Sequence, residues 1–61
     1  MRIINRYTHP IHGNCYLWEE SAMNYRIGTV ATNYAKFDGW TYDEVVEKIN
    51  EKGFRVLPWN P

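Results

Sequence analysis

The sequence predicts a small α+β domain in which one helix packs on one face of a mostly antiparallel sheet. Three observations support this class. A chain of 61 residues has room for one domain, residues 1–61. Short segments rich in β-branched and aromatic residues alternate with turn residues through its first half. One amphipathic segment and a last short apolar segment follow, so the predicted order is β-β-β-α-β.

The first two strands are predicted from β-forming residues that end in turn chemistry. Residues 2–8 are rich in Ile, Tyr and Thr, and they stop shortly before Pro10, which cannot donate a ladder hydrogen bond. His12-Gly13-Asn14 has the composition of a turn. Residues 15–19 then form the second predicted strand, which ends at Glu20-Ser21.

The remaining strands flank a predicted turn and the helix. Residues 24–32 form the third predicted strand, and residues 37–40, Phe-Asp-Gly-Trp, form a turn that leads into the helix. After the helix, residues 54–57 form a short strand that Pro58 ends.

The helix is predicted over residues 41–52 by signals at both of its ends. Thr41 and Glu44 form a capping box, in which the side chain of each residue accepts a hydrogen bond from the backbone N–H of the other. Tyr42, Val45, Val46 and Ile49 then fall on one face at helical spacing. Gly53 supplies the left-handed residue that commonly follows a helix.

Composition and charge exclude several classes of protein. Seven basic residues balance seven acidic ones, which weakens any case for generic binding to nucleic acid or to an anionic membrane. No apolar run is long enough to cross a bilayer, and the first residues lack the apolar stretch of a secretory signal. Cys15 is the only cysteine, so no internal disulfide can form. We expect a complete small gene product in a reducing cytoplasm, with no cofactor.

Two clusters suggest chemistry, and for both we favour a structural interpretation. His9, His12 and Cys15 are competent zinc ligands, but a structural zinc site needs a fourth ligand that the sequence does not place nearby. Cys15 with His12 could act as nucleophile and base, but a chain this short has little room for a cleft. We therefore expect a loop with exposed histidines and a structural cysteine that packs against the helix.

The acidic residues do not indicate an enzyme. Most of them have predicted roles as helix caps, first-turn charges or solvated helix positions, and Glu19 and Glu20 flank a strand end. The four glycines are scattered and match no phosphate-binding pattern.

Strand alternation divides the side chains between two faces of the sheet. The predicted core comprises Ile3, Tyr7, Cys15, Leu17, Tyr25, Ile27, Phe54 and Val56. The opposite face is predicted to collect all four arginines (Arg2, Arg6, Arg26 and Arg55) around Ile4, Tyr16, Trp18, Val30 and Leu57.

An open face with Arg, Trp and Tyr is typical of a protein interface. We expect a non-enzymatic binding protein that forms a homodimer and docks on a larger protein partner. A domain near this size is also marginally stable alone, which favours self-association. The expected partner-binding or dimer residues are Arg2, Arg6, Tyr16, Trp18, Arg26, Arg55, Leu57 and Trp59. The alternative is a single-stranded nucleic-acid-binding protein that uses the same face.

No motif ties the chain to a known family. Neutral, aromatic-rich proteins of roughly 60 residues without catalytic motifs are typical of phage-encoded inhibitors, which block a larger host enzyme. By this analogy we expect an inhibitor of a host defence or nucleic-acid enzyme, acting in the host cytoplasm.

Overall fold

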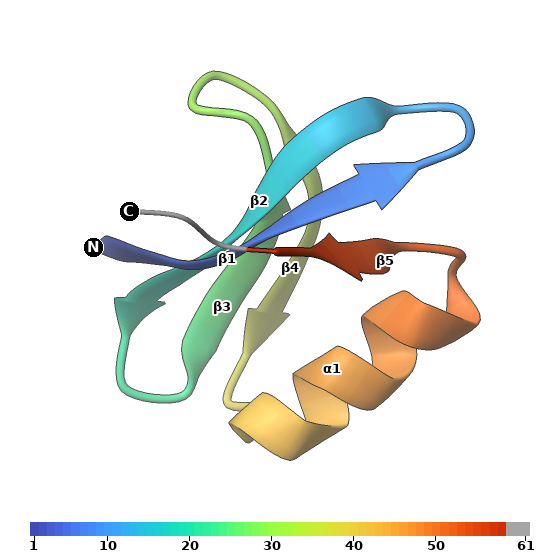
Figure 1. The fold of residues 1–61 in the computed structure, drawn as a ribbon. Coiled ribbons are helices and arrows are strands. Elements are labelled where there is room, and N and C mark those ends of the chain that lie inside the picture. Colours follow the sequence, from blue (N-terminus) through green and yellow to red (C-terminus); the bar gives the residue numbers. More distant parts are fainter. Residues whose placement is uncertain (59–61) are drawn as a thin grey trace.

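The computed structural model describes residues 1–58 and shows one antiparallel sheet with a single helix on one side (Figure 1). The strands are β1 (Arg2–His9), β2 (Gly13–Ser21), β3 (Asn24–Gly28), β4 (Asn33–Asp38) and β5 (Arg55–Leu57). The helix α1 (Tyr42–Glu51) lies between β4 and β5 in the chain. In the sheet the strands follow the order β4-β3-β2-β1-β5, so β4 and β5 are the two edges. The predicted α+β class is confirmed.

The helix agrees with the sequence prediction at both ends. The Thr41 hydroxyl accepts from the Glu44 backbone N–H at 3.3 Å, and the Glu44 carboxylate accepts from the Thr41 backbone N–H at 2.9 Å. At the other end Gly53 has φ +96°, and Phe54 N donates to Ile49 O at 3.0 Å. This is a Schellman motif, which satisfies the last helix carbonyls and directs the chain into β5.

The prediction missed a strand. The expected strand 24–32 ends at Gly28, and the expected turn at residues 37–40 begins inside β4. A side chain at Gly28 would overlap the Thr32 carbonyl, because residues 29–32 fold back over it. The backbone N–H of Thr29 donates to Thr32 O at 2.9 Å, and the Thr29 hydroxyl accepts from Thr32 N at 3.0 Å. This loop returns the chain into β4, which completes the order β-β-β-β-α-β.

The hydrophobic core lies between the sheet and α1. We call the side of the sheet that faces α1 the inner face. Its buried residues come from β1 to β4, the helix and the residue before β5: Tyr7, Cys15, Leu17, Tyr25, Ile27, Phe37, Val45, Ile49 and Phe54.

A bulge in β1 corrects part of the predicted core. Ile3 pairs with Trp18 and Asn5 pairs with Leu17, so one extra residue, Ile4, lies between these two pairs. A bulge reverses the alternation of every residue beyond it. Ile4 therefore packs against the core, and Ile3 moves to the opposite side of the sheet.

Val56 is also not a core residue. Its side chain is 58% exposed, whereas the prediction placed it inside with Phe54. β5 is a three-residue edge strand that pairs only with Arg6–Thr8, so it has a sheet neighbour on one side.

Candidate functional site

The side of the sheet away from α1, which we call the outer face, carries the residues that the sequence singled out. The strand registers place one residue from each of β1 to β4 in a row across it: Ile3, Trp18, Arg26 and Lys36. A second row contains Leu57, Arg6, Tyr16, Gly28 and Asn33. No helix or strand within residues 1–58 covers these rows (Figure 1).

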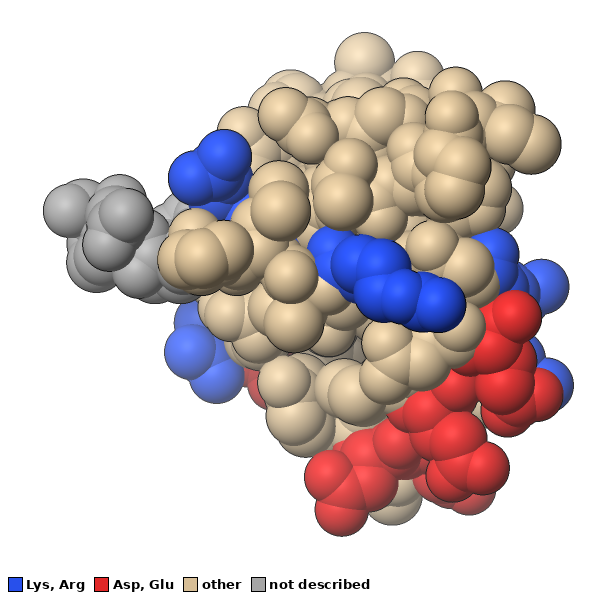
Figure 2. Space-filling model, turned by 45° about the vertical axis from the view of Figure 1, so that its right-hand side comes forward, with Lys and Arg blue, Asp and Glu red and all other residues tan. Residues whose placement is uncertain are grey.

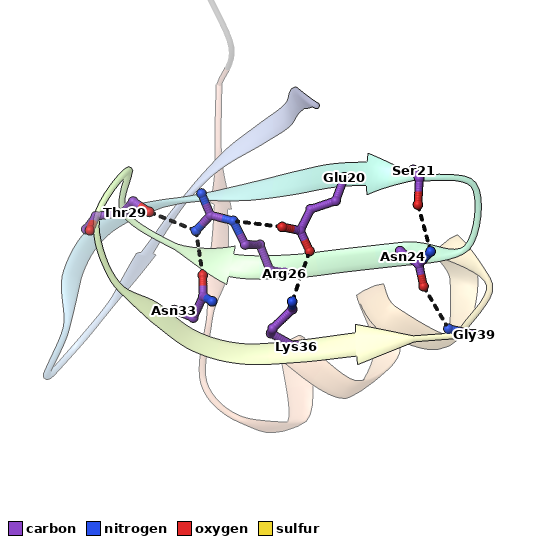
Figure 3. Close-up of polar contacts among 8 residues, drawn as sticks. All are labelled: Glu20, Ser21, Asn24, Arg26, Thr29, Asn33, Lys36 and Gly39. Atoms are coloured by element: carbon purple, nitrogen blue, oxygen red, sulfur yellow. Dashed lines mark hydrogen bonds and ion pairs between the residues drawn. The ribbon is translucent and has the colours of Figure 1, made fainter.

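Arg26 is the centre of the outer face. The residue is only 5% exposed, although it lies on the side of the sheet that the helix leaves open. One guanidinium nitrogen, Nη1, donates to the Asn33 side-chain oxygen at 2.7 Å and to Thr29 O at 2.9 Å (Figure 3). Both acceptors come from the segment that follows β3, so Arg26 ties the β3–β4 loop to the sheet.

Trp18 lies directly across from Arg26 on the neighbouring strand. The guanidinium carbon is 4.5 Å from the centre of the Trp18 ring, a cation–π contact. The indole N–H donates to Gly28 O at 3.2 Å, and the Tyr16 ring meets the indole edge-on at 5.8 Å. Trp18 is therefore only 8% exposed. The sequence placed it on this face but did not predict its burial.

Glu20 balances the charge of this centre. It occupies an irregular position in β2, where the register with β3 shifts between Glu19 and Ser21. One carboxylate oxygen lies 3.8 Å from Arg26 Nε, and the other lies 3.4 Å from Lys36 Nζ (Figure 3). The carboxylate therefore joins two cations from neighbouring strands.

One of the four predicted arginines, Arg2, is not on this face, and a second, Arg55, turns its guanidinium away toward the backbone of α1. Arg2 pairs with Glu19 across the strands and lies beyond the bulge, so its side chain shares the inner side with Glu19 and Tyr25. Its Nε donates to the Glu19 carboxylate at 2.7 Å. Arg55 pairs with Thr8, which keeps it on the side of Leu57 and Arg6, but its guanidinium bends back to the last turn of α1 and donates to Asn50 O at 3.3 Å. Val30, also expected here, lies in the β3–β4 loop, and Trp59 lies outside the described residues.

Glu19 and Glu20 line a shallow hollow of about 360 Å³ together with Met1, Arg2, Ser21 and Ala22. Both carboxylates already have partners, because Glu20 joins Arg26 and Lys36 while Glu19 accepts from Arg2 and from the Tyr25 hydroxyl at 3.4 Å. The hydrogen bond from Arg2 lowers the pKa of Glu19, and burial followed by the neighbouring Glu19 charge raises the pKa of Tyr25.

His9 and Cys15 have different structural roles and do not form a common site. His9 Nδ1 accepts from the backbone N–H groups of Ile11 and His12 at 3.1 and 3.3 Å, while Nε2 lies 3.0 Å from Lys52 O. Cys15 is 1% exposed in the core, and its burial raises the pKa of the thiol. Within residues 1–58 no three His, Cys, Asp or Glu side chains are grouped to hold a metal ion.

Charge is divided between the two sides of the molecule. The exposed positions of α1 carry Asp43, Glu44, Glu47 and Glu51. Figure 2 shows an acidic band at its lower right. The outer face instead holds Arg6, Arg26 and Lys36 together with Glu20 and Asp38. The acidic side chains are therefore concentrated on the helix side, and the outer face carries both signs of charge.

The comparisons with known proteins identify no relative. No family model, no curated protein and no solved structure matches the chain.

Proposed function

We propose that this chain is a small non-enzymatic binding protein that docks its outer face on a larger protein and blocks the surface it covers. We also propose that it self-associates. The partly exposed side chains around the Trp18–Arg26 pair carry the docking proposal. The pair itself is a buried aromatic and cationic centre on the side of the sheet that α1 leaves open.

The surroundings of this pair have the composition of an interaction surface. Tyr16, Ile3, Arg6 and Leu57 surround the buried centre and are partly exposed. Aromatic residues and arginine contribute most to binding energy at protein interfaces, particularly where neighbouring side chains hold them in place. A partly apolar partner surface with acidic groups near Arg6 fits this face.

The contacts of the outer face favour a protein over single-stranded nucleic acid. A base-stacking platform needs an open ring face, whereas Arg26 lies over the Trp18 ring. A phosphate-binding groove needs free cations, whereas Arg26 and Lys36 both lie within 4 Å of the Glu20 carboxylate.

The test compares variants that keep the buried centre intact. Arg6→Ala with Tyr16→Ala removes two partly exposed side chains of the outer face, and Glu47→Ala is the matched control on α1. The tagged wild-type chain is used to capture a partner from lysate, and its affinity for each variant is then measured. We expect the double variant to lose at least tenfold in affinity and Glu47→Ala to bind normally.

Two results would overturn the docking proposal. One is equal binding by the double variant and the wild type. The other is binding to a labelled single-stranded oligonucleotide with a steep salt dependence, which would establish the nucleic-acid alternative.

A further inference from the structure

The two edges of the sheet differ in length. β5 has three residues and is followed by Pro58, whereas β4 has six residues, Asn33–Asp38. Within residues 1–58, β3 is the only strand that pairs with β4, so the far side of β4 is an open edge. An open edge strand offers a row of backbone donors and acceptors to another strand.

The direction of the backbone groups along β4 follows from the turn after it. Gly39 N donates to Met23 O at 2.7 Å, toward the β3 side. Because the N–H and C=O groups of alternate residues point to opposite sides of a strand, those of Phe37 and Ala35 also point toward β3. Those of Lys36 and Asp38 point outward from the edge.

The charges on β4 are arranged so that the strand is complementary to itself. Lys36 and Asp38 are exposed, lie two residues apart on the outer side of the sheet, and flank the buried Phe37. In an antiparallel pair of identical strands with Phe37 opposite Phe37, each Lys36 stands opposite an Asp38. Opposite charges directly across a strand pair stabilise it.

We propose that two copies of this chain associate by antiparallel pairing of their β4 strands, with the two-fold axis at Phe37. Lys36 of one copy and Asp38 of the other then exchange both main-chain hydrogen bonds, and their side chains form an ion pair. The Glu20 carboxylate lies 3.4 Å from Lys36 and adds a second acidic neighbour to that cation.

Charge also selects this register over its neighbours. A two-fold axis at Lys36 sets the two lysines against each other, and one at Asp38 sets the two aspartates against each other. Like charges directly opposite destabilise a strand pair. The two-fold axis at Phe37 is perpendicular to the sheet, so the outer faces of both copies lie on the same side and stay free.

This inference rests on the self-association proposed above, and it is independent of the docking of the outer face. Its test exchanges the charges one at a time. Lys36→Asp leaves aspartate at both positions of β4, and Asp38→Lys leaves lysine at both, so each variant repels a copy of itself. An equimolar mixture of the two variants restores opposite charges at both pairs.

The mass of each sample is measured by sedimentation equilibrium over a dilution series, and circular dichroism checks that each variant is folded. We expect a wild-type dimer, at least tenfold weaker self-association of each single variant, and a dimer in the mixture. The double variant Lys36→Asp, Asp38→Lys is also expected to form a dimer. Glu47→Lys, which changes the net charge as much as Asp38→Lys does, is expected to associate like the wild type.

Three results would overturn the proposal. Single variants that associate as tightly as the wild type would assign the dimer to another surface and leave self-association itself intact. A mixture of folded variants that stays monomeric would exclude the pairing of Lys36 with Asp38. A wild type that is monomeric at every concentration would overturn the edge pairing and the self-association together.

Discussion

At the scale of single residues, His9 connects three parts of the chain. Its ring accepts two backbone N–H groups from the β1–β2 loop, contacts the carbonyl that follows α1, and packs at 4.5 Å on the Phe54 ring. All these contacts come from one imidazole, with Nδ1 as acceptor and Nε2–H as donor. His9 is thus a structural residue that joins the hairpin to the end of the helix.

We expect His9→Ala to lower the free energy of unfolding by about 1–3 kcal/mol, because it leaves two backbone donors and the Lys52 carbonyl without their partner. Ile11→Ala in the same loop is the control. Its side chain is 86% exposed, and its effect is expected to stay within about 0.5 kcal/mol. Urea unfolding measures both, and equal effects of the two substitutions would contradict the role of His9.

Cys15 gives a second prediction at this scale. Burial beneath the helix raises the pKa of the thiol, so it stays neutral near pH 7 and is shielded from reagents. We expect a thiol reagent such as dithionitrobenzoate to react far more slowly with the folded protein than with the urea-unfolded protein. Equal rates in the two states would mean that Cys15 is accessible.

At the scale of elements, the capping box at the start of α1 is the most direct test of the fold. Thr41→Ala removes the hydroxyl that accepts from Glu44 N, and we expect a loss of about 1 kcal/mol. In a domain of this size that loss lowers the melting temperature by about 4–8 °C. Thr41→Ser retains the hydroxyl and is expected to melt close to the wild type. Calorimetry that finds no difference between these variants would contradict the cap.

The same box contributes a pH dependence. The hydrogen bond from the Thr41 backbone, followed by that from its side chain, lowers the pKa of Glu44 below its ordinary value of 4.5. The stabilisation is therefore complete above pH 4.5 and is lost as the pH falls through the lowered value. We expect acid to destabilise Glu44→Gln less steeply than the wild type. The free energy of unfolding of both proteins is measured at a series of pH values below about 5, where this contribution is lost. Equal slopes of that free energy against pH in the two proteins would contradict the prediction.

The elements also show which parts of the fold the sequence could predict. The helix was predicted well because caps and periodicity are local signals. β4 was missed because its sequence, Asn-Tyr-Ala-Lys-Phe-Asp, contains few β-forming residues. The strand is held by its pairing with β3 and by Arg26, which binds Asn33, and neither contact can be read from the composition of residues 33–38. Gly28 was the available signal, since a glycine within a predicted strand often marks a bend.

The outer face was predicted only in part for a similar reason. Alternation correctly placed Arg6, Tyr16 and Trp18 on one side, because β2 and the second half of β1 are regular there. The bulge at Ile4 moved Arg2 to the other side, and nothing in the local sequence marks a bulge at that isoleucine. Burial of Arg26 required the positions of Glu20, Asn33 and Trp18, which only the folded sheet brings together.

At the scale of the whole molecule, size and charge together favour association. A domain of 61 residues without a disulfide has a small core and is marginally stable alone. The acidic side chains of α1 lie together on one side, so a two-fold contact through that helix would bring like charges together. The β4 edge, where both signs alternate, avoids this conflict.

The proposed association of the folded chain would make its stability depend on concentration. Binding of a second copy stabilises the folded state by mass action, on the order of 1 kcal/mol for each tenfold rise in protein concentration above the dissociation constant. We expect the melting temperature of the wild type to rise by several degrees over a hundredfold concentration range. Lys36→Asp, which repels its own copy at β4, is expected to melt at the same temperature throughout that range. Circular dichroism melts at the two ends of the range measure both slopes. A wild-type melting temperature that does not change with concentration would mean that the folded chain gains no stability from a second copy. The contacts among β1 to β5 and α1 would then account for the stability of the folded chain by themselves.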